Sequence, residues 1–330
     1  MKAYNSATLP ASIAVPAPGA APEAAPGKPP EAGAGRGILF AALGVVAFSL
    51  TFPATAWSLE GMGPWTVTSA RVVLGALLAC ATLAVARVPP PARRHWPGLA
   101  VVALGCVIGF PLLTTLALMT SSTAHAAVVV GLLPLTTAVY AALRTGSRPS
   151  RAFWVAALAG AGVVVAFALR ESGGAPASGD LFLFAALLVC AAGYGEGGRL
   201  AHELPGWQVI SWALVLCLPL AVLGTAVALL AEPVRLTAHS VAGLLWVAAG
   251  SQFLGLMVWY RGLARAGVAR ASQLQLAQPL LTLVWSVALL GEHLSPAAPV
   301  AALAVLVCIA VTQRARDRSG RRDARPTHQT

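Results

Sequence analysis

Ten long apolar stretches constrain the fold of this chain more than any other feature. They lie between residues 37 and 313, each about 20 residues long, and short loops rich in glycine and proline separate them. A helical stretch of this length matches the hydrocarbon thickness of a bilayer. Only 10% of the residues are charged, whereas soluble domains carry about 25%. We therefore predict an all-α integral membrane protein with ten transmembrane helices, and a soluble enzyme is excluded.

The apolar stretches and their loop residues set the expected bounds of the elements. We expect helices over residues 37–58, 65–86, 96–119, 122–143, 152–170, 180–200, 207–231, 239–261, 268–290 and 296–313. Residues 1–36 are rich in alanine and proline, and residues 314–330 are strongly basic. Both are predicted to be disordered tails, because neither has enough apolar residues to form a core.

The formal net charge of +11 is distributed according to topology. Nineteen basic residues fall in the two tails and in alternate loops, while the intervening loops hold only Arg170 and Arg235. Basic residues accumulate on the cytoplasmic side of membrane proteins. This pattern predicts cytoplasmic termini and an even number of spans. It also explains the positive charge without a nucleic-acid partner.

The two halves of the apolar region are related in sequence. A shift of 145 residues aligns Pro134 with Pro279, and a shift of 142 residues aligns Trp65 with Trp207. Residues 37–170 and 180–313 are therefore predicted to be two repeats of five helices each. Because five is odd, the second repeat would cross the membrane in the opposite sense to the first. Inverted repeats of this kind are typical of secondary transporters that work by alternating access.

The chain resembles the EamA-type members of the drug/metabolite transporter superfamily over about residues 38–313. The residues that carry the resemblance are Phe48-Ser49-Leu50-Thr51-Phe52-Pro53, Arg71, Pro134, Pro279 and Leu290-Gly291-Glu292-His293-Leu294. The resemblance implies a ten-helix carrier of the bacterial inner membrane that exports amino acids or other small metabolites in exchange for protons. One departure is visible, because the first half has Gly146-Ser147-Arg148 where the second has Gly291-Glu292-His293.

Two matched prolines indicate a candidate substrate site. Pro134 and Pro279 each lie near the middle of an expected helix. A proline removes a backbone donor and would free the carbonyl four residues earlier, at Val130 and Gln275. Exposed backbone at matched positions of two repeats is typical of a transporter site. The alternative is an ordinary packing kink.

Polar side chains in the ninth expected helix strengthen that interpretation. Gln275 and Gln278 are three residues apart and would share one helix face. Each amide can both donate and accept hydrogen bonds, which suits zwitterions or sugars. Hydrogen bonding between helices is the alternative role.

Arg71 is the one arginine expected inside a span, six residues after Trp65. A charge at this depth should face the bundle interior or a wet cavity. Its guanidinium suits a carboxylate or phosphate of the substrate. A structural pair with an acidic residue or with backbone carbonyls is the alternative.

Two titratable residues are candidates for proton coupling. Glu196 is the only acidic residue expected inside a span, near the cytoplasmic end of the sixth helix. It could instead form an interfacial pair with Arg199, three residues later. His125, near the outer end of the fourth helix, could titrate near neutral pH, and a helix-terminus role is its alternative.

No motif indicates a cofactor or a metal. Nucleotide-binding, zinc-binding and hydrolase motifs are absent from the sequence, and the five cysteines are widely spaced in apolar stretches. A small-molecule substrate and membrane lipid are the expected partners. A homodimer is left open, although the Gly105–Gly109 pair favours close packing within the chain.

These observations together predict a secondary active transporter that exports small metabolites by proton-coupled alternating access. A facilitative exchanger and a non-transport membrane partner protein are the alternatives. A membrane-embedded enzyme is less favoured, because no cluster of acidic, histidine and serine residues gathers at one interface.

Overall fold

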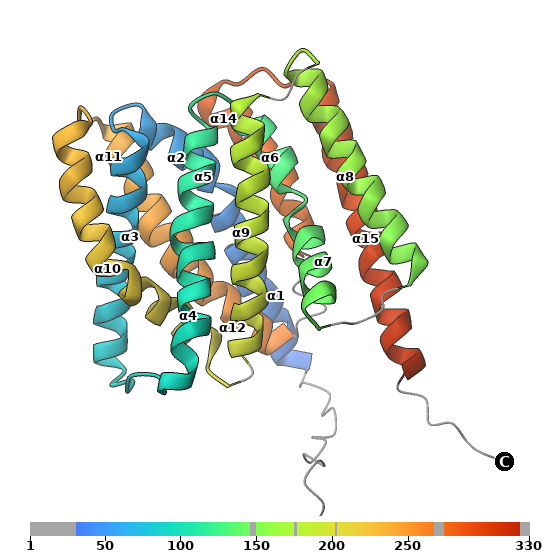
Figure 1. Cartoon of the computed structure of the whole chain (residues 1–330), viewed down its shortest axis with the longest axis horizontal. Helices are drawn as coiled ribbons and strands as arrows, with labels where there is room; N and C mark the ends of the chain where they lie inside the picture. Colours follow the sequence, from blue (N-terminus) through green and yellow to red (C-terminus); the bar gives the residue numbers. More distant parts are fainter. Residues whose placement is uncertain (1–30, 146–149, 175–176, 202, 267–273, 324–330) are drawn as a thin grey trace, which may run out of the picture.

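The computed structural model describes residues 31–145, 150–174, 177–201, 203–266 and 274–323 (Figure 1). Within these ranges every element of regular secondary structure is helical. The elements are α1 (Glu31–Ser49), α2 (Thr51–Leu59), α3 (Pro64–Val85), η1 (Arg93–His95), α4 (Trp96–Val102), η2 (Ala103–Gly109), α5 (Phe110–Ala117), α6 (Thr123–Val130), α7 (Leu133–Thr145), α8 (Arg151–Glu171), α9 (Ser178–Leu200), α10 (Gly206–Ala231), α11 (Ala238–Leu245), η3 (Trp246–Gly255), α12 (Leu256–Ala266), η4 (Gln275–Ala277), α14 (Gln278–Leu290) and α15 (Ala297–Asp323).

The described helices confirm an all-α membrane protein. Eight of them are long and apolar enough to cross a bilayer: Gly35–Leu59, Pro64–Val85, Arg93–Ala117, Thr123–Arg144, Arg151–Glu171, Ser178–Leu200, Gly206–Ala231 and Ala238–Trp259. Two shorter apolar helices follow, Gln275–Leu290 and Ala297–Val311. The expected ninth helix would begin at residue 268, and residues 267–273 lie outside the described part of the chain.

Helix bounds differ from the expected ones at both tails. Helix α1 begins at Glu31, six residues before the expected start at 37. Helix α15 continues to Asp323, through ten residues that were assigned to the basic tail. Arginine has a high helix propensity and no proline interrupts α15 after Pro299, so the helix continues beyond its apolar part. The other tail residues, 1–30 and 324–330, lie outside the described residues.

Several apolar stretches are broken inside the bundle, and a proline lies close after each of three breaks. Helix α1 ends before Leu50 and α2 carries Pro53 in its first turn. Pro134 is the second residue of α7, and Pro279 is the second residue of α14. Proline is tolerated in the first turn of a helix, where its missing N–H group has no partner to lose. Each proline thus lies in the first turn after a short interruption of the regular α-helix, within one apolar segment.

The core has two main parts, and each combines residues from both halves of the chain. One part packs residues of α6, α7, α8 and α9 against α14 and α15. The other packs α3, α4 and η2 against α9, α10 and η3, with Val72, Leu99 and Leu214 fully buried. In Figure 1, α8 and α15 lie side by side at one edge of the bundle, and α10 and α11 lie at the opposite edge.

The Gly105–Gly109 pair lies inside the bundle. A Cβ atom added at Gly105 would lie 2.4 Å from the carbonyl oxygen of Val189, so η2 approaches the backbone of α9 closely. The pair therefore serves packing within the chain.

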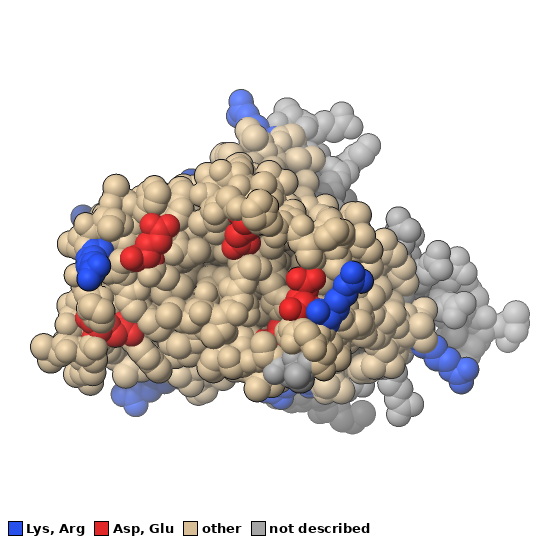
Figure 2. All heavy atoms as spheres, turned by 90° about the horizontal axis from the view of Figure 1, so that it is seen from above, with Lys and Arg blue, Asp and Glu red and all other residues tan. Residues whose placement is uncertain are grey.

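The two ends of the bundle differ in charge. We call the upper end in Figure 1 the acidic end, since its loops and helix ends carry Glu60, Glu171, Glu232 and Glu292. Seen from above, several acidic side chains lie across this face (Figure 2). We call the opposite end, where α15 finishes, the basic end; it carries Arg93, Arg94, Arg144, Arg151 and Arg199. This separation follows the alternation of basic loops in the sequence.

Candidate functional site

Arg71 is buried between helices of the two halves. It lies on α3 with only 5% of its surface exposed, and its Nε donates a hydrogen bond to Oε1 of Gln252, at 2.9 Å. Gln252 lies on the π-helical segment η3 and is itself buried. Among the described residues, no carboxylate is within ion-pairing distance of Arg71. The acidic partner that the sequence left open is therefore not found there.

Two buried polar atoms near Arg71 also lack partners. Thr68 lies one turn before Arg71 on the same helix, and its hydroxyl makes no hydrogen bond within the described chain. The Nε2 of Gln252 is likewise unpaired in the same part of the structure. Buried polar groups almost always have partners, so these two atoms mark a polar position between α3 and η3.

The two matched helix breaks lie against each other. A Cβ atom added at Gly131, in the break between α6 and α7, would lie 3.4 Å from Cγ of Pro279. The carbonyl of Gln275, however, is not free as the sequence predicted, because it accepts the N–H group of Gln278 in a short 3₁₀ turn. The side chains of Gln275 and Gln278 are half-buried and make no hydrogen bond to another described residue. Within the described chain, their two amide groups are thus available to a ligand.

The sequence-predicted substrate residues do not form a single contact cluster. Arg71 contacts Gln252 of η3, whereas Pro279 lies against Gly131 at the end of α6. The described contacts therefore give two polar positions in the bundle, one around Arg71 and one around the paired breaks with Pro134, Gln275 and Gln278.

A third break, between α1 and α2, is held by helices of the second half. The hydroxyl of Thr282 donates to the Ser49 carbonyl, and the indole N–H of Trp285 donates to the Ser49 hydroxyl, both at 2.9 Å. The hydroxyls of Thr51 and Ser251 are 2.6 Å apart. In the sequence, Ser49 and Thr51 entered only through the family resemblance, and Thr282, Trp285 and Ser251 were not singled out. The position of Ser49 and Thr51 just before Pro53 was the available signal.

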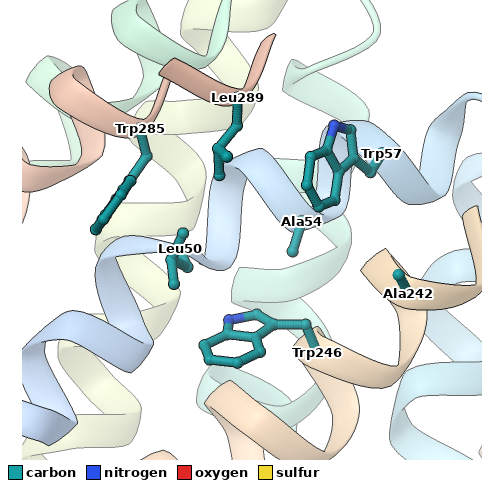
Figure 3. A pocket seen from close by; sticks show the side chains of 7 residues that line it. All are labelled: Leu50, Ala54, Trp57, Ala242, Trp246, Trp285 and Leu289. Atoms are coloured by element: carbon teal, nitrogen blue, oxygen red, sulfur yellow. The ribbon is translucent and has the colours of Figure 1, made fainter. Parts of the chain in front are cut away.

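An apolar cavity of about 370 Å³ borders this break (Figure 3). Tryptophan rings from α2, η3 and α14 lie around it. Its lining residues are Leu50, Ala54, Trp57, Ala242, Trp246, Trp285 and Leu289. The lining carries no charged side chain, so the cavity suits an apolar group.

His125 forms a buried pair with Asp180. The Nε2 of His125 and Oδ1 of Asp180 are 2.6 Å apart, and only 2% of Asp180 is exposed. The other oxygen of Asp180 accepts hydrogen bonds from the Ser172 hydroxyl and the Ala177 amide. The expectation that Glu196 is the only acidic residue inside a span is wrong, because Asp180 lies in the first turn of α9 and inside the bundle. Asp180 was the first residue of the helix expected over residues 180–200, so the sequence treated it as a helix end and not as an interior group.

Glu196 has two basic partners near the basic end of the bundle. Its carboxylate is 2.8 Å from Nε of Arg199 and 3.5 Å from an Nη nitrogen of Arg144. Both arginine side chains are more than half exposed. The interfacial pair with Arg199 that the sequence left open is therefore present, and Arg144 of α7 is added to it.

Comparisons with known proteins agree with this geometry. The sequence profile of the EamA-like transporter family matches residues 35–168 and 177–313. The protein named "Uncharacterized transporter YdeK" of Bacillus subtilis (strain 168) is 42% identical over 275 residues, which cover 82% of this chain and 95% of that protein. A solved crystal structure is similar with a TM-score of 0.59 and 21% identity, covering 84% of this chain and 98% of its own. That likeness supports the fold alone.

Proposed function

The chain belongs to the EamA-like transporter family, within the drug/metabolite transporter superfamily, and from this premise we propose that it is a proton-coupled secondary transporter that exports small metabolites. The observation that carries the coupling is the buried pair of His125 and Asp180. Uptake of one proton by a neutral histidine beside a carboxylate changes the charge of the pair from −1 to 0. A change of charge inside the bundle can shift the balance between two conformations.

We also propose that residues 37–170 and 180–313 are inverted five-helix repeats, which give ten spans. The family profile matches the chain twice, and each of two aligned prolines starts a helix after a break. The charge difference between the two ends supports cytoplasmic termini in a bacterial inner membrane. In such a fold, exchanging the conformations of the two halves would move the opening from one side to the other.

The paired breaks supply the substrate position in this proposal. Pro134 and Pro279 lie at the starts of α7 and α14, and Gln275 and Gln278 offer amides beside one of them that no described residue pairs with. Amides that both donate and accept suit amino acids and related polar compounds. Arg71 would contact the substrate from α3.

The test is transport by purified protein in proteoliposomes under an imposed pH gradient. We would screen radiolabelled amino acids, nucleosides and sugar phosphates against wild-type protein, with a pH-indicator dye inside the vesicles. We expect His125→Gln and Asp180→Asn to reduce gradient-driven flux at least about tenfold, while exchange of substrate across the membrane without a gradient continues. Glu60→Gln is the matched control, because Glu60 pairs with the exposed His239 at the same end.

Two results would contradict the proposal. Gradient-driven flux that persists in both His125 and Asp180 variants would remove the coupling role of the pair and leave Glu196 as the next candidate. Exchange by wild-type protein without any response to the pH gradient would instead identify a facilitative exchanger.

A further inference from the structure

We propose that Arg71, Gln252 and Thr68 form a subsite for a monoanionic carboxylate group of the transported compound. This inference rests on the proposed transport function and adds a class of substrate to it. None of the three side chains is more than 6% exposed, and they come from two helices that belong to different halves of the chain.

Arg71 has no counter-charge among the described residues. An arginine without an ionic partner is expensive inside a membrane protein, and such residues usually face a pathway or a paired charge. The described acidic groups closest to the start of α3 have other partners. Glu232 accepts hydrogen bonds from the backbone of Trp65 and Thr66, and Glu60 is paired with His239. The charge of Arg71 is thus left for a group that enters the bundle.

The guanidinium of Arg71 is held in one orientation by Gln252. Gln252 accepts only the Nε–H group, so it fixes the plane of the guanidinium and leaves both Nη groups without a partner in the described structure. Two parallel N–H groups match the two oxygens of a carboxylate. Gln252 therefore acts as a positioning residue for Arg71.

Gln252 and Thr68 each have a buried polar atom without a partner in the described chain. The Nε2 of Gln252 is a donor and the hydroxyl of Thr68 can donate, and neither is bonded to a described residue. Buried donors without partners are destabilising unless a ligand satisfies them. Gln252 bonds Arg71 directly, and Thr68 lies one turn before Arg71 on α3.

Charge balance selects a monoanion. Arg71 is the only buried arginine among the described residues, so the subsite supplies one positive charge. A carboxylate would be neutralised there, whereas a phosphate dianion would leave one buried negative charge. Because buried charges need full compensation, the site favours the carboxylate.

The inference is tested by binding, at one pH and without a membrane gradient. Thermal unfolding of the purified full-length protein in detergent would be followed with isobutyrate and phenylacetate, and with their neutral amides, isobutyramide and phenylacetamide, as probes. We expect the two acids to raise the Tm of the wild type more than the amides do. Arg71→Gln should weaken the apparent affinity for the acids at least about tenfold. Its unliganded Tm should equal or exceed that of the wild type, since an unpaired buried charge is removed.

Three further variants separate a binding role from a structural one. Arg71→Lys keeps the charge without the planar pair of Nη groups and should bind the acids more weakly than the wild type but more tightly than Arg71→Gln. Gln252→Leu tests the positioning role should Arg71→Gln fail to fold, and it should also weaken acid binding. Arg235→Gln, which removes an exposed arginine at the acidic end, should behave as the wild type.

The inference is overturned if acids and amides shift the wild-type Tm equally, or if Arg71→Gln and Gln252→Leu retain the full response to the acids. Neither result depends on proton coupling. A protein that binds the acids normally but shows no gradient-driven flux would contradict the proposed coupling and leave the subsite intact.

Discussion

At the acidic end, two carboxylates accept backbone N–H groups from the start of a helix in the other half of the chain, whereas at the basic end the carboxylates pair with side chains, mostly arginines that are more than half exposed. Glu232 follows α10 and accepts the amides of Trp65 and Thr66 at the start of α3, at 3.2 and 2.8 Å. Glu292 follows α14 and accepts the amides of Thr123 and Ala124 at the start of α6, at 2.8 and 2.9 Å. Both carboxylates thus satisfy free helix donors and lie at the positive end of a helix dipole.

The carboxylates of the basic end have weaker partners. Glu203 contacts Arg94 and His95; 75% of the Arg94 side chain is exposed, whereas His95 is buried. The two arginines paired with Glu196 are also mostly exposed. Exposed ion pairs contribute little and are screened by salt. The acidic end is thus joined by carboxylates that cap helix starts and the basic end by side-chain pairs, and we expect the basic end to separate at a lower cost.

The sequence contains this asymmetry. The counterpart of Glu292 in the first half is Ser147, at the offset of 145 residues, and the counterpart of Glu232 is Pro90, at the offset of 142 residues. Neither counterpart can supply a carboxylate to a helix start. Gly291 adds to the difference, since its positive φ of 64° ends α14 and turns the chain before Glu292. The Gly-Glu pair of the second half is therefore a helix end followed by a cap for another helix.

Removing the stronger of the two caps should produce the largest effect. Glu292→Gln removes the charge at the start of α6 and leaves one acceptor for two N–H groups. We expect it to lower the free energy of unfolding by about 2 kcal/mol. Denaturant unfolding in detergent measures this loss, and hydrogen exchange at Thr123 and Ala124 should become faster. A loss no larger than that of Glu60→Gln would show that the cap does not hold this end closed.

The second cap includes one longer, exposed hydrogen bond from the Trp65 amide, so its removal should have a smaller effect. Glu232→Gln is expected to lower the free energy of unfolding by about 1 kcal/mol, because the amide and the hydroxyl of Thr66 share one oxygen, which a glutamine can still supply. The double variant with Glu292→Gln measures coupling between the caps. Additive losses would mean that α3 and α6 are held independently, and a larger combined loss would mean that the acidic end opens as one unit.

The predictable part of this molecule was set by local chemistry. The length of the apolar stretches predicted the spans, and proline predicted the interruptions at Pro134 and Pro279. The isolated charge of Arg71 predicted that this side chain is buried in the bundle. Each of these follows from a few neighbouring residues. The bounds of α1 and α15 were less accurate, because hydropathy marks the membrane and not the end of the helix.

The partners of the polar residues could not be predicted, because packing brings them together across long separations. Arg71 and Gln252 are 181 residues apart in the chain, and His125 and Asp180 are 55 residues apart. Asp180 was expected at the first position of its helix, after a glycine-rich segment, and the approach of α6 to the start of α9 buries it. A single sequence contains no signal for these distances.

At the basic end, Glu196 offers a test of whether its carboxylate carries protons or only holds two arginines. Glu196→Gln is expected to lower the free energy of unfolding by roughly 0.5–1 kcal/mol, since both arginines are exposed and screened. Flux driven by a pH gradient should continue in this variant. If that flux is lost in Glu196→Gln while the His125 and Asp180 variants keep it, the proton-coupling group lies at the basic end and not at the acidic end.

The smallest effect is expected at Glu203, and it should depend on pH. The hydrogen bond from His95 is the main cause that lowers the pKa of the Glu203 carboxyl below its usual value; burial opposes it, and the charge of Arg94 adds a smaller lowering effect. A carboxyl with a lowered pKa in the folded state contributes stability above its unfolded pKa, about 4.3, and loses it as the pH falls through the folded value. Glu203→Gln should therefore match the wild type below that range and be slightly less stable near neutral pH. Unfolding curves at pH 3.5 and at pH 7 measure the difference, which high salt should reduce. An equal loss at both pH values would show that packing, and not the ion pair, accounts for the contribution of Glu203.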